Sequence, residues 1–125
     1  MHVSDAQLLP SLRVDAEITL SALGYNVVER LERLAPFGQG NPPPSLLVRH
    51  CRVLGPPRRM GKGGQVVSLM LSQGELSLRA VGFAMGDLAD QLVGVNFVDA
   101  VVQPTLNRFQ GQCNVELQIK DIAWE

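Results

Sequence analysis

Basic side chains are the chemistry that this sequence concentrates, and they lie in its middle third. Six of the eleven Lys and Arg residues fall between positions 45 and 85, where Glu75 is the one acidic residue. The remainder of the chain is acidic, so the formal net charge of −1 conceals a positive middle segment. Clustered cations can bind the phosphates of a nucleic acid, with an affinity that falls as salt rises. The six residues are Arg49, Arg52, Arg58, Arg59, Lys62 and Arg79.

A cation beside an aromatic ring occurs further along the chain, at Arg108 and Phe109. Such a ring can stack on an unpaired base while the cation contacts the backbone of the strand. Both sets of residues also have an ordinary structural interpretation. The stretch from Arg58 to Gly64 could be a solvated loop, and Phe109 could cap a hydrophobic core. Charge alone does not decide between the two interpretations.

Constellations that perform catalysis are missing from the sequence. His2 and His50 are the only histidines, and no Cys-x-x-Cys or His-x-x-x-His spacing of a metal site occurs. His50 and Cys51 are adjacent, so in a strand their side chains point to opposite faces and cannot form a dyad. Asp87 and Asp90 have the spacing of one helix face, where they would favour the helix N-terminus. We expect neither a hydrolytic site nor a metal or cofactor in this chain.

Length and composition predict one globular domain, because 125 residues with 46% hydrophobic and 18% charged side chains can bury a core. The two cysteines, Cys51 and Cys113, are too few for a disulfide framework. They are predicted to be buried thiols, and a bond between them stays open. The apolar runs are too short to span a bilayer, and the N-terminus shows no targeting segment. We therefore expect a cytoplasmic protein with no membrane partner.

Hydrophobic periodicity predicts a helix near the N-terminus. Val27, Leu31 and Leu34 recur at helical spacing with Val28 beside them, which gives one apolar stripe. Pro36 ends the helix because proline lacks the N–H that the helix needs. A short strand within residues 12–20 could precede it.

After Pro44 the period changes to that of β-strands. Strands are predicted at residues 45–54, 66–72, 76–84, 97–106 and 114–120, with a loop at 55–64, turns at 73–75 and 107–111, and a short helix at 86–92. Five short strands with a helix between the third and fourth is the order of a mainly β, OB-type Greek-key barrel. We expect two parts, an N-terminal segment with its helix at residues 1–43 and the barrel at 44–125.

Barrels of this type bind oligonucleotides over their second and third strands and through the loops that join strands 1–2 and 4–5. The predicted elements place basic residues in these positions. The expected DNA-binding residues are Arg58, Arg59 and Lys62 in the 1–2 loop, Arg79 on the third strand, and Arg108 with Phe109 in the 4–5 turn.

Several stretches resemble the C-terminal part of RecJ-type exonucleases of the DHH family. Residues 34–42 read Leu-Ala-Pro-Phe-Gly-Gln-Gly-Asn-Pro and are similar to the family's Pro-Phe-Gly-x-Gly-Asn-Pro signature. Residues 80–86 resemble the stretch that leads into the barrel helix, and residues 106–111 and 115–122 resemble the family's turn and closing strand. The prolines and glycines of the signature favour a structural junction over a DNA clamp.

The resemblance implies an OB domain that holds single-stranded DNA for 5′→3′ degradation in DNA repair and recombination. Catalysis would belong to separate DHH and DHHA1 domains of the same parent protein, with Mn²⁺ or Mg²⁺ bound by aspartates and histidines whose motifs do not occur in this sequence. A second function stays open. The chain could instead brace the nuclease core or recruit a partner protein, and an exposed apolar patch without a basic groove would favour that alternative.

Overall fold

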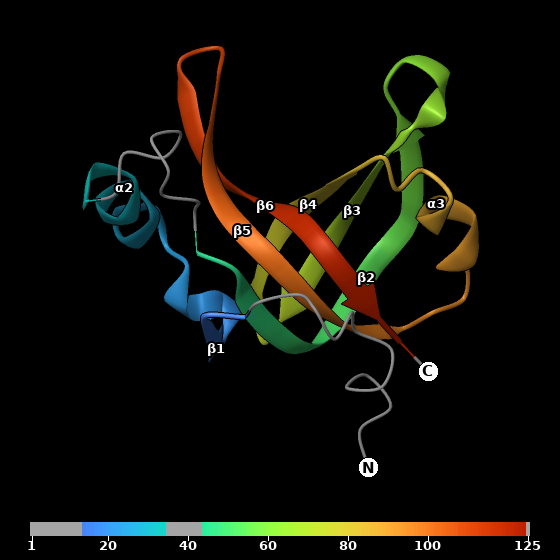
Figure 1. Ribbon diagram of the computed structural model, residues 1–125, viewed down its shortest axis with the longest axis horizontal. Helices are drawn as coiled ribbons and strands as arrows, with labels where there is room; N and C mark the ends of the chain where they lie inside the picture. The colour runs from blue at the N-terminus through green and yellow to red at the C-terminus, as the bar shows by residue number, and fades with distance from the viewer. Residues whose placement is uncertain (1–13, 35–43, 125) are drawn as a thin grey trace.

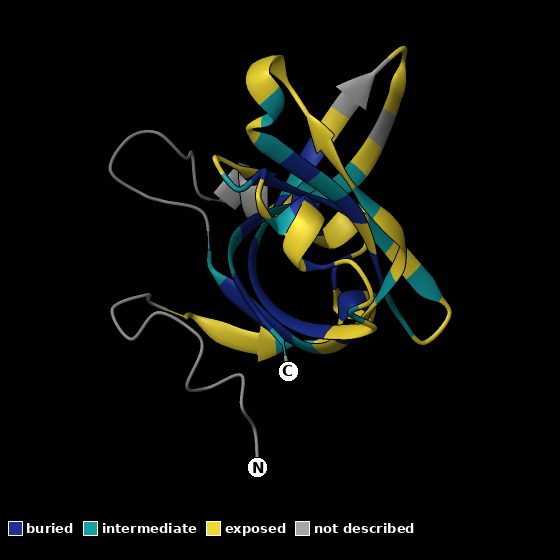
Figure 2. Ribbon diagram, turned by 90° about the vertical axis from the view of Figure 1, so that its right-hand side faces the viewer, coloured by how far each residue is buried: buried dark blue, intermediate teal, exposed yellow. Residues whose placement is uncertain are grey.

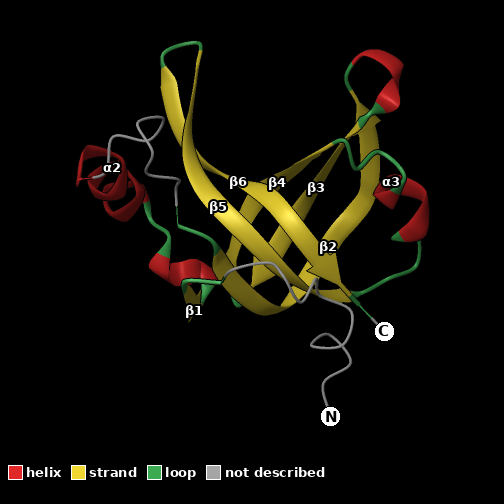
Figure 3. Cartoon of the chain, in the orientation of Figure 1, coloured by secondary structure: helices red, strands yellow, loops and turns green. Residues whose placement is uncertain are grey.

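The pairing of six strands explains how this chain is built. In the computed structural model, residues 14–34 and 44–124 are described, apart from the side chains of residues 31–34, 108, 109 and 113. The strands are β1 (Ala16–Ile18), β2 (Leu46–Met60), β3 (Val66–Gln73), β4 (Leu76–Phe83), β5 (Phe97–Phe109) and β6 (Gln112–Ala123). The helical segments are η1 (Leu20–Ala22), α2 (Tyr25–Leu34), η2 (Lys62–Gly64) and α3 (Leu88–Gln91). Figure 3 shows these helical segments outside the ring of strands.

The sheet closes on itself. Hydrogen-bonded neighbours follow the order β1-β2-β3-β4-β6-β5, and an additional pairing of β2 with β5 completes a barrel (Figure 1). Neighbouring barrel strands are antiparallel except β4 and β6, which are parallel. α3 lies in the connection between β4 and β5. The predicted fold is therefore confirmed: a mainly β, five-stranded OB-type barrel with a helix between its third and fourth strands.

Alternating apolar residues fill the barrel interior, as their spacing predicts. Residues 100–102 of β5 are buried in succession, so this strand is covered on both faces. In Figure 2 the buried segments form the wall of the barrel, while the β2–β3 end that projects from it is mostly exposed. The buried apolar residues of β3 and β6 are Val67, Leu69, Leu71, Leu117, Ile119, Ile122 and Ala123.

The N-terminal segment packs onto the same core. β1 pairs in parallel with the start of β2, and an Asp15 carboxylate oxygen accepts the Ser45 backbone N–H at 2.8 Å. Leu20 and Leu23 belong to the buried cluster of the barrel. β1 is shorter than the strand predicted within residues 12–20, part of which lies outside the described residues. The proposed junction at residues 36–42 also lies outside them.

Helix α2 buries a different valine from the one predicted to lead its apolar stripe. Val28 is fully buried in the core cluster, whereas Val27 is 47% exposed. The sequence was compatible with burial of either valine, because Leu31 lies four residues after Val27 and three after Val28. Contact with the barrel selected the Val28 face. Among the described residues, none of the helices has the length and apolar character needed to cross a membrane.

Strand β2 is longer than predicted, so the loop expected at residues 55–64 is wrong for 55–60 and holds only for the connection at 61–64. β2 continues to Met60, and its pairing with β3 is interrupted only between Leu54 and Arg58. Pro56 and Pro57 lie in this bulge, where the ladder requires no N–H from them. Beyond Arg52 the other edge of β2 makes no pair with β5, so the prolines break no bond there either.

The turn predicted at residues 73–75 is confirmed, since Gly74-Glu75 joins β3 to β4. The two later connections differ from the predicted ones. α3 (Leu88–Gln91) begins later than the helix predicted at 86–92. β5 runs on to Phe109, so only Gln110 and Gly111 form the turn to β6. Their φ angles of 53° and 77° are the two positive values of a type I′ hairpin turn.

Candidate nucleic-acid interface

The outward-pointing residues of β2, β3 and β4 gather cationic and apolar side chains on one side of the barrel. In antiparallel pairing, residues opposite one another point to the same side of the sheet. Arg58 pairs with Ser68, Met70 with Arg79, and Val66 lies between Met60 and Phe83. We call this surface the outer face and define it by Arg58, Met60, Ser68, Met70, Arg79 and Phe83.

Two hairpin ends flank the outer face. The end of β2 with η2, and the β5–β6 hairpin, rise from the same end of the barrel with β3 and β4 between them (Figure 1). These ends correspond to the 1–2 and 4–5 loops of an OB-type barrel. Lys62 lies in η2 and is exposed. The outer face therefore lies between two projecting ends, and Lys62 places an exposed cation on one of them.

Arg79 lies at the centre of the outer face and is held there by its neighbours. Its Nε donates to the Ser68 hydroxyl at 3.1 Å, and a terminal guanidinium nitrogen lies 3.2 Å from the Met60 sulfur. Glu116 of β6 lies 3.8 Å from Nε, and the same Glu116 oxygen accepts from the Asn107 amide at 3.3 Å. The side chain is still 44% exposed. Arg79 is thus oriented outward with N–H groups left for a phosphate.

Arg58 and Lys62 are the more accessible cations of the predicted set. Both are exposed, and neither makes an ion pair or a side-chain hydrogen bond with any residue that the structure describes. Arg58 occupies the strand register directly opposite Ser68, so it stands on the outer face and not in a loop. These two side chains can reach a nucleic-acid backbone without first breaking a contact within the described chain.

Arg59 points elsewhere, because successive residues of a strand face opposite sides. One of its terminal nitrogens lies 2.6 Å from an Asp90 oxygen and 3.4 Å from an Asp87 oxygen, both on or beside α3. The other terminal nitrogen donates to the Gly64 carbonyl at 3.3 Å. The hydrogen bond with Asp90, followed by its charge, raises the pKa of Arg59. Asp87 makes no capping bond with α3, so both carboxylates serve Arg59.

The last two predicted residues, Arg108 and Phe109, are placed by their backbone alone. They lie at the end of β5, opposite Cys113 and Gln112 of β6, and so belong to the strand and not to the turn. Their side chains are outside the described part of the chain. Their role in DNA binding stays a prediction.

Sequence reasoning missed the exposed apolar side chains of the outer face. Phe83 is 56% exposed, and Met60 and Met70 are 40% and 37% exposed. The signal was present for Phe83, because it shares odd-numbered parity with Ser77 and Arg79, although Val81 of the same parity is buried. An exposed aromatic ring beside an arginine suits contact with a base.

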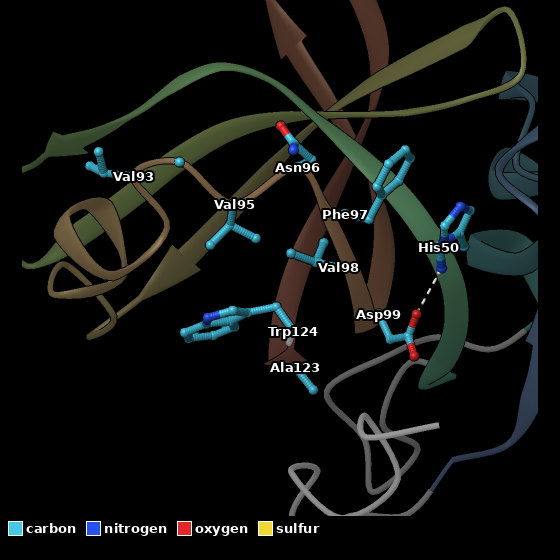
Figure 4. Close-up of a pocket in the computed structure, with 10 residues that line it drawn as sticks. His50, Val93, Val95, Asn96, Phe97, Val98, Asp99, Ala123 and Trp124 are labelled. Atoms are coloured by element: carbon cyan, nitrogen blue, oxygen red, sulfur yellow. Dashed lines mark hydrogen bonds between the residues drawn. The ribbon is translucent and has the colours of Figure 1, made fainter. Parts of the chain in front are cut away.

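A separate pocket of about 510 Å³ opens on another part of the barrel, where residues 93–99 meet Trp124. The His50 ring stacks on Phe97 with centroids 4.2 Å apart, and Figure 4 shows this pair and Trp124 on opposite sides of the pocket. Asp99 is engaged, since it accepts the His50 backbone N–H at 2.7 Å and lies 3.4 Å from the Arg49 guanidinium.

Chemistry of the catalytic kind is not assembled in the described residues. His50 is exposed and Cys51 is fully buried, which confirms that their side chains lie on opposite faces. Cys51 is a free thiol, and burial, with the nearby charge of Asp99, raises its pKa to about 12. Within residues 14–34 and 44–124, no three His, Cys, Asp or Glu side chains come together as metal ligands.

Known proteins resemble this chain both in sequence and in structure. Residues 14–121 match the family model described as RecJ OB domain. The chain is 26% identical over 121 residues to the Single-stranded-DNA-specific exonuclease RecJ of Bacillus subtilis (strain 168). That match covers 97% of this chain and 15% of the relative, so the chain spans a small part of that protein.

Solved structures agree. RecJ from Thermus thermophilus in complex with Mg²⁺ aligns with a TM-score of 0.58 and 26% identity, over 82% of this chain and 15% of that one. A putative aspartyl-tRNA synthetase from Leishmania major Friedlin aligns with a TM-score of 0.56 at 16% identity, over 93% of this chain and 22% of that one, which shows the fold alone. With the family model matched from residue 14 to residue 121, this chain belongs to the RecJ OB domain family.

Proposed function

We propose that this chain binds single-stranded DNA on its outer face and holds it for a RecJ-type exonuclease. The observation that carries the proposal is the grouping of Arg58 and Arg79 with the exposed ring of Phe83, between two projecting hairpin ends. Phosphates would pair with the arginines and with Lys62, and a base would stack on the ring. The name of the Bacillus subtilis relative, a single-stranded-DNA-specific exonuclease, supports this substrate class.

The apolar part of the outer face favours a single strand over a duplex. Bases in a duplex are stacked on one another and offer their edges to a protein, whereas unpaired bases expose their faces. Phe83, Met60 and Met70 can contact such faces without distinguishing one base from another. We expect little sequence preference.

The parent protein would supply the catalytic step. The described residues bring no three His, Cys, Asp or Glu side chains together, while a solved Thermus thermophilus RecJ contains Mg²⁺ and another contains Mn²⁺. We place hydrolysis in separate DHH and DHHA1 domains of the same polypeptide, with one of these metals, in the cytoplasm during DNA repair and recombination. In that arrangement this domain contributes substrate affinity and no reacting group.

The test is fluorescence anisotropy of a labelled single-stranded oligonucleotide at several salt concentrations. Arg58→Ala and Arg79→Ala should each weaken binding by about 1 kcal/mol, roughly five-fold. Each should also lower the slope of log affinity against log salt by about 0.7, since one phosphate contact is lost. Arg30→Ala, which removes the same charge from the exposed surface of α2, is the matched control and should change neither quantity. Equal effects of all three variants would reduce the proposal to general attraction between charges.

A docking role for another surface has its own supporting observation. Val93 is 72% exposed and Phe97 44% exposed at the pocket beside Trp124, so apolar side chains lie open there beside the polar His50, Asn96 and Asp99, and no Lys or Arg lines the pocket. Such a patch suits contact with protein. If the chain fails to bind DNA at high micromolar concentration, bracing of the nuclease core through this patch becomes the better proposal.

A further inference from the structure

We propose that Arg59 is a positioning residue, which fixes the β2–β3 connection so that Lys62 and Arg58 present their charges to the strand, and which does not itself bind phosphate. The proposal rests on the DNA-binding function proposed above. The sequence predicts that Arg59 binds DNA directly. In the structure its side chain points away from the outer face, in the direction opposite to that of its neighbour Arg58.

The first observation is the set of bonds that the Arg59 guanidinium makes. It joins the end of β2 to α3, about thirty residues later in the chain, through Asp90 at 2.6 Å and Asp87 at 3.4 Å. A planar guanidinium can hold two acceptors at fixed angles, which a lysine cannot. Both carboxylates are largely exposed, so the pairs contribute little by themselves to the stability of the fold.

The second observation is that the Arg59 side chain also contacts the β2–β3 connection itself. Arg59 donates to the Gly64 carbonyl at 3.3 Å, and a Cβ at Gly64 would lie 3.4 Å from Arg59 Cδ. Residues Gly61, Gly63 and Gly64 all have positive φ angles, which glycine adopts with little cost. A connection built from three such residues has many alternative conformations, and the Arg59 contacts select one of them.

A third contact joins the same two segments through backbone atoms alone. The Gly86 N–H donates to the Gln65 carbonyl at 3.1 Å, and a Cβ at Gly86 would collide with the Gly64 carbonyl oxygen. The connection and the start of α3 therefore touch at a place with no room for a side chain. We call Arg59, Gly64, Gly86, Asp87 and Asp90 together the β2–α3 joint, and α3 lies beside the upper part of β2 in Figure 1.

The β2–α3 joint matters for binding because it holds the β2–β3 connection, and Lys62 lies in that connection. A cation on a mobile loop must be ordered when the strand binds, and the entropy lost in that ordering weakens the binding. Two carboxylates already neutralise Arg59, so its charge releases no counterion from DNA. Loss of Arg59 should therefore weaken affinity without changing the number of phosphate contacts.

Salt dependence separates positioning from direct contact. Arg59→Ala should bind the single-stranded oligonucleotide roughly two- to ten-fold more weakly, with an unchanged slope of log affinity against log salt. Arg58→Ala, the adjacent residue, should lower the slope. A lowered slope for Arg59→Ala would overturn the proposal while leaving the DNA-binding function intact.

A charge exchange and a measurement without DNA complete the test. The double variant Arg59→Asp with Asp90→Arg rebuilds the pair in reverse, so it should recover most of the affinity lost in Arg59→Asp alone. Absence of recovery would contradict the joint. Hydrogen exchange of the Gly64 and Gly86 amides should accelerate in Arg59→Ala, and unchanged rates would overturn the proposal even if the chain binds no DNA. Failure of the wild type to bind would instead overturn the proposed function.

Discussion

On β4, Arg79 and Phe83 lie four residues apart on the same side of the strand, so one stretch of DNA could contact both. Arg79 is oriented by Ser68 and Glu116, while the ring of Phe83 is the most exposed aromatic side chain of the described residues. An oriented cation can pair with a phosphate, whereas an exposed ring can stack on a base. Their contributions to affinity should therefore differ in salt dependence.

Replacement of Phe83 tests the stacking contribution. Phe83→Ala should weaken single-strand binding by about 1–3 kcal/mol, or roughly five-fold and more, because a base loses its stacking partner. The loss should be similar at low and high salt, since no charge is removed. Phe97→Ala removes a ring of comparable exposure from the separate pocket and is the matched control in the same anisotropy titration. Similar losses for both variants would count against stacking on the outer face.

The pKa of the Cys51 thiol provides a test of burial in the core. Its pKa is raised from 9.0 to about 12 by burial, so the folded state keeps the thiol protonated where the unfolded state has lost its proton. The stabilising contribution is complete below pH 9 and is lost as the pH rises toward 12. Wild type should therefore lose free energy of unfolding relative to Cys51→Ala across this range. Denaturant unfolding of both proteins at about pH 7, 9 and 10.5 measures the difference, and a constant difference would refute the assignment.

At the scale of elements, the close approach of the β2–β3 connection to α3 has a consequence for stability. Gly86→Ala should destabilise the fold by about 1–3 kcal/mol, because the added methyl group meets the backbone of Gly64 and cannot be accommodated by a rotamer change. Gly24→Ala is the control, since open space surrounds that position. Thermal unfolding should show a clear fall in Tm for the first variant only, and equal values would contradict the contact.

Strands were predictable from the sequence where hydrophobic alternation alone identified them. Alternation in β3, β4 and β6 identified both the strands and the residues that face outward, Arg79 included. The end of β2 was not predictable in this way, because Pro56 and Pro57 ordinarily stop a strand and are tolerated here only at an unpaired bulge. The face of α2 depended on a contact with the barrel, which local spacing does not contain.

The candidate site was predictable in part for the same reason. Strand parity placed Arg79 correctly, and charge density identified Arg58 and Lys62 as accessible cations. The partners of Arg59 could not be inferred, because Asp87 and Asp90 approach it only when α3 folds back against β2. Strand alternation gives Arg58 and Arg59 opposite directions, and the long-range contact with α3 determines which residues Arg59 meets.

For the whole molecule, the separation of charge makes the proposed binding of a polyanion compatible with a net charge of −1. Cations stand on the outer face and in η2, whereas acidic residues lie on α3, β1 and the N-terminal side. The negative regions would repel DNA from the rest of the surface and restrict it to one path. Binding should therefore be localised, and not spread over the protein.

Chemical-shift mapping of this chain by NMR, with a short oligothymidine added in steps, would locate the surface that binds DNA. We expect the shifts to concentrate in β3, β4 and the 61–65 connection, with Arg58 and Phe83 among the most affected residues. Residues 93–99, at the separate pocket, should remain unchanged. Shifts confined to that pocket, or spread evenly over the barrel, would contradict binding on the outer face.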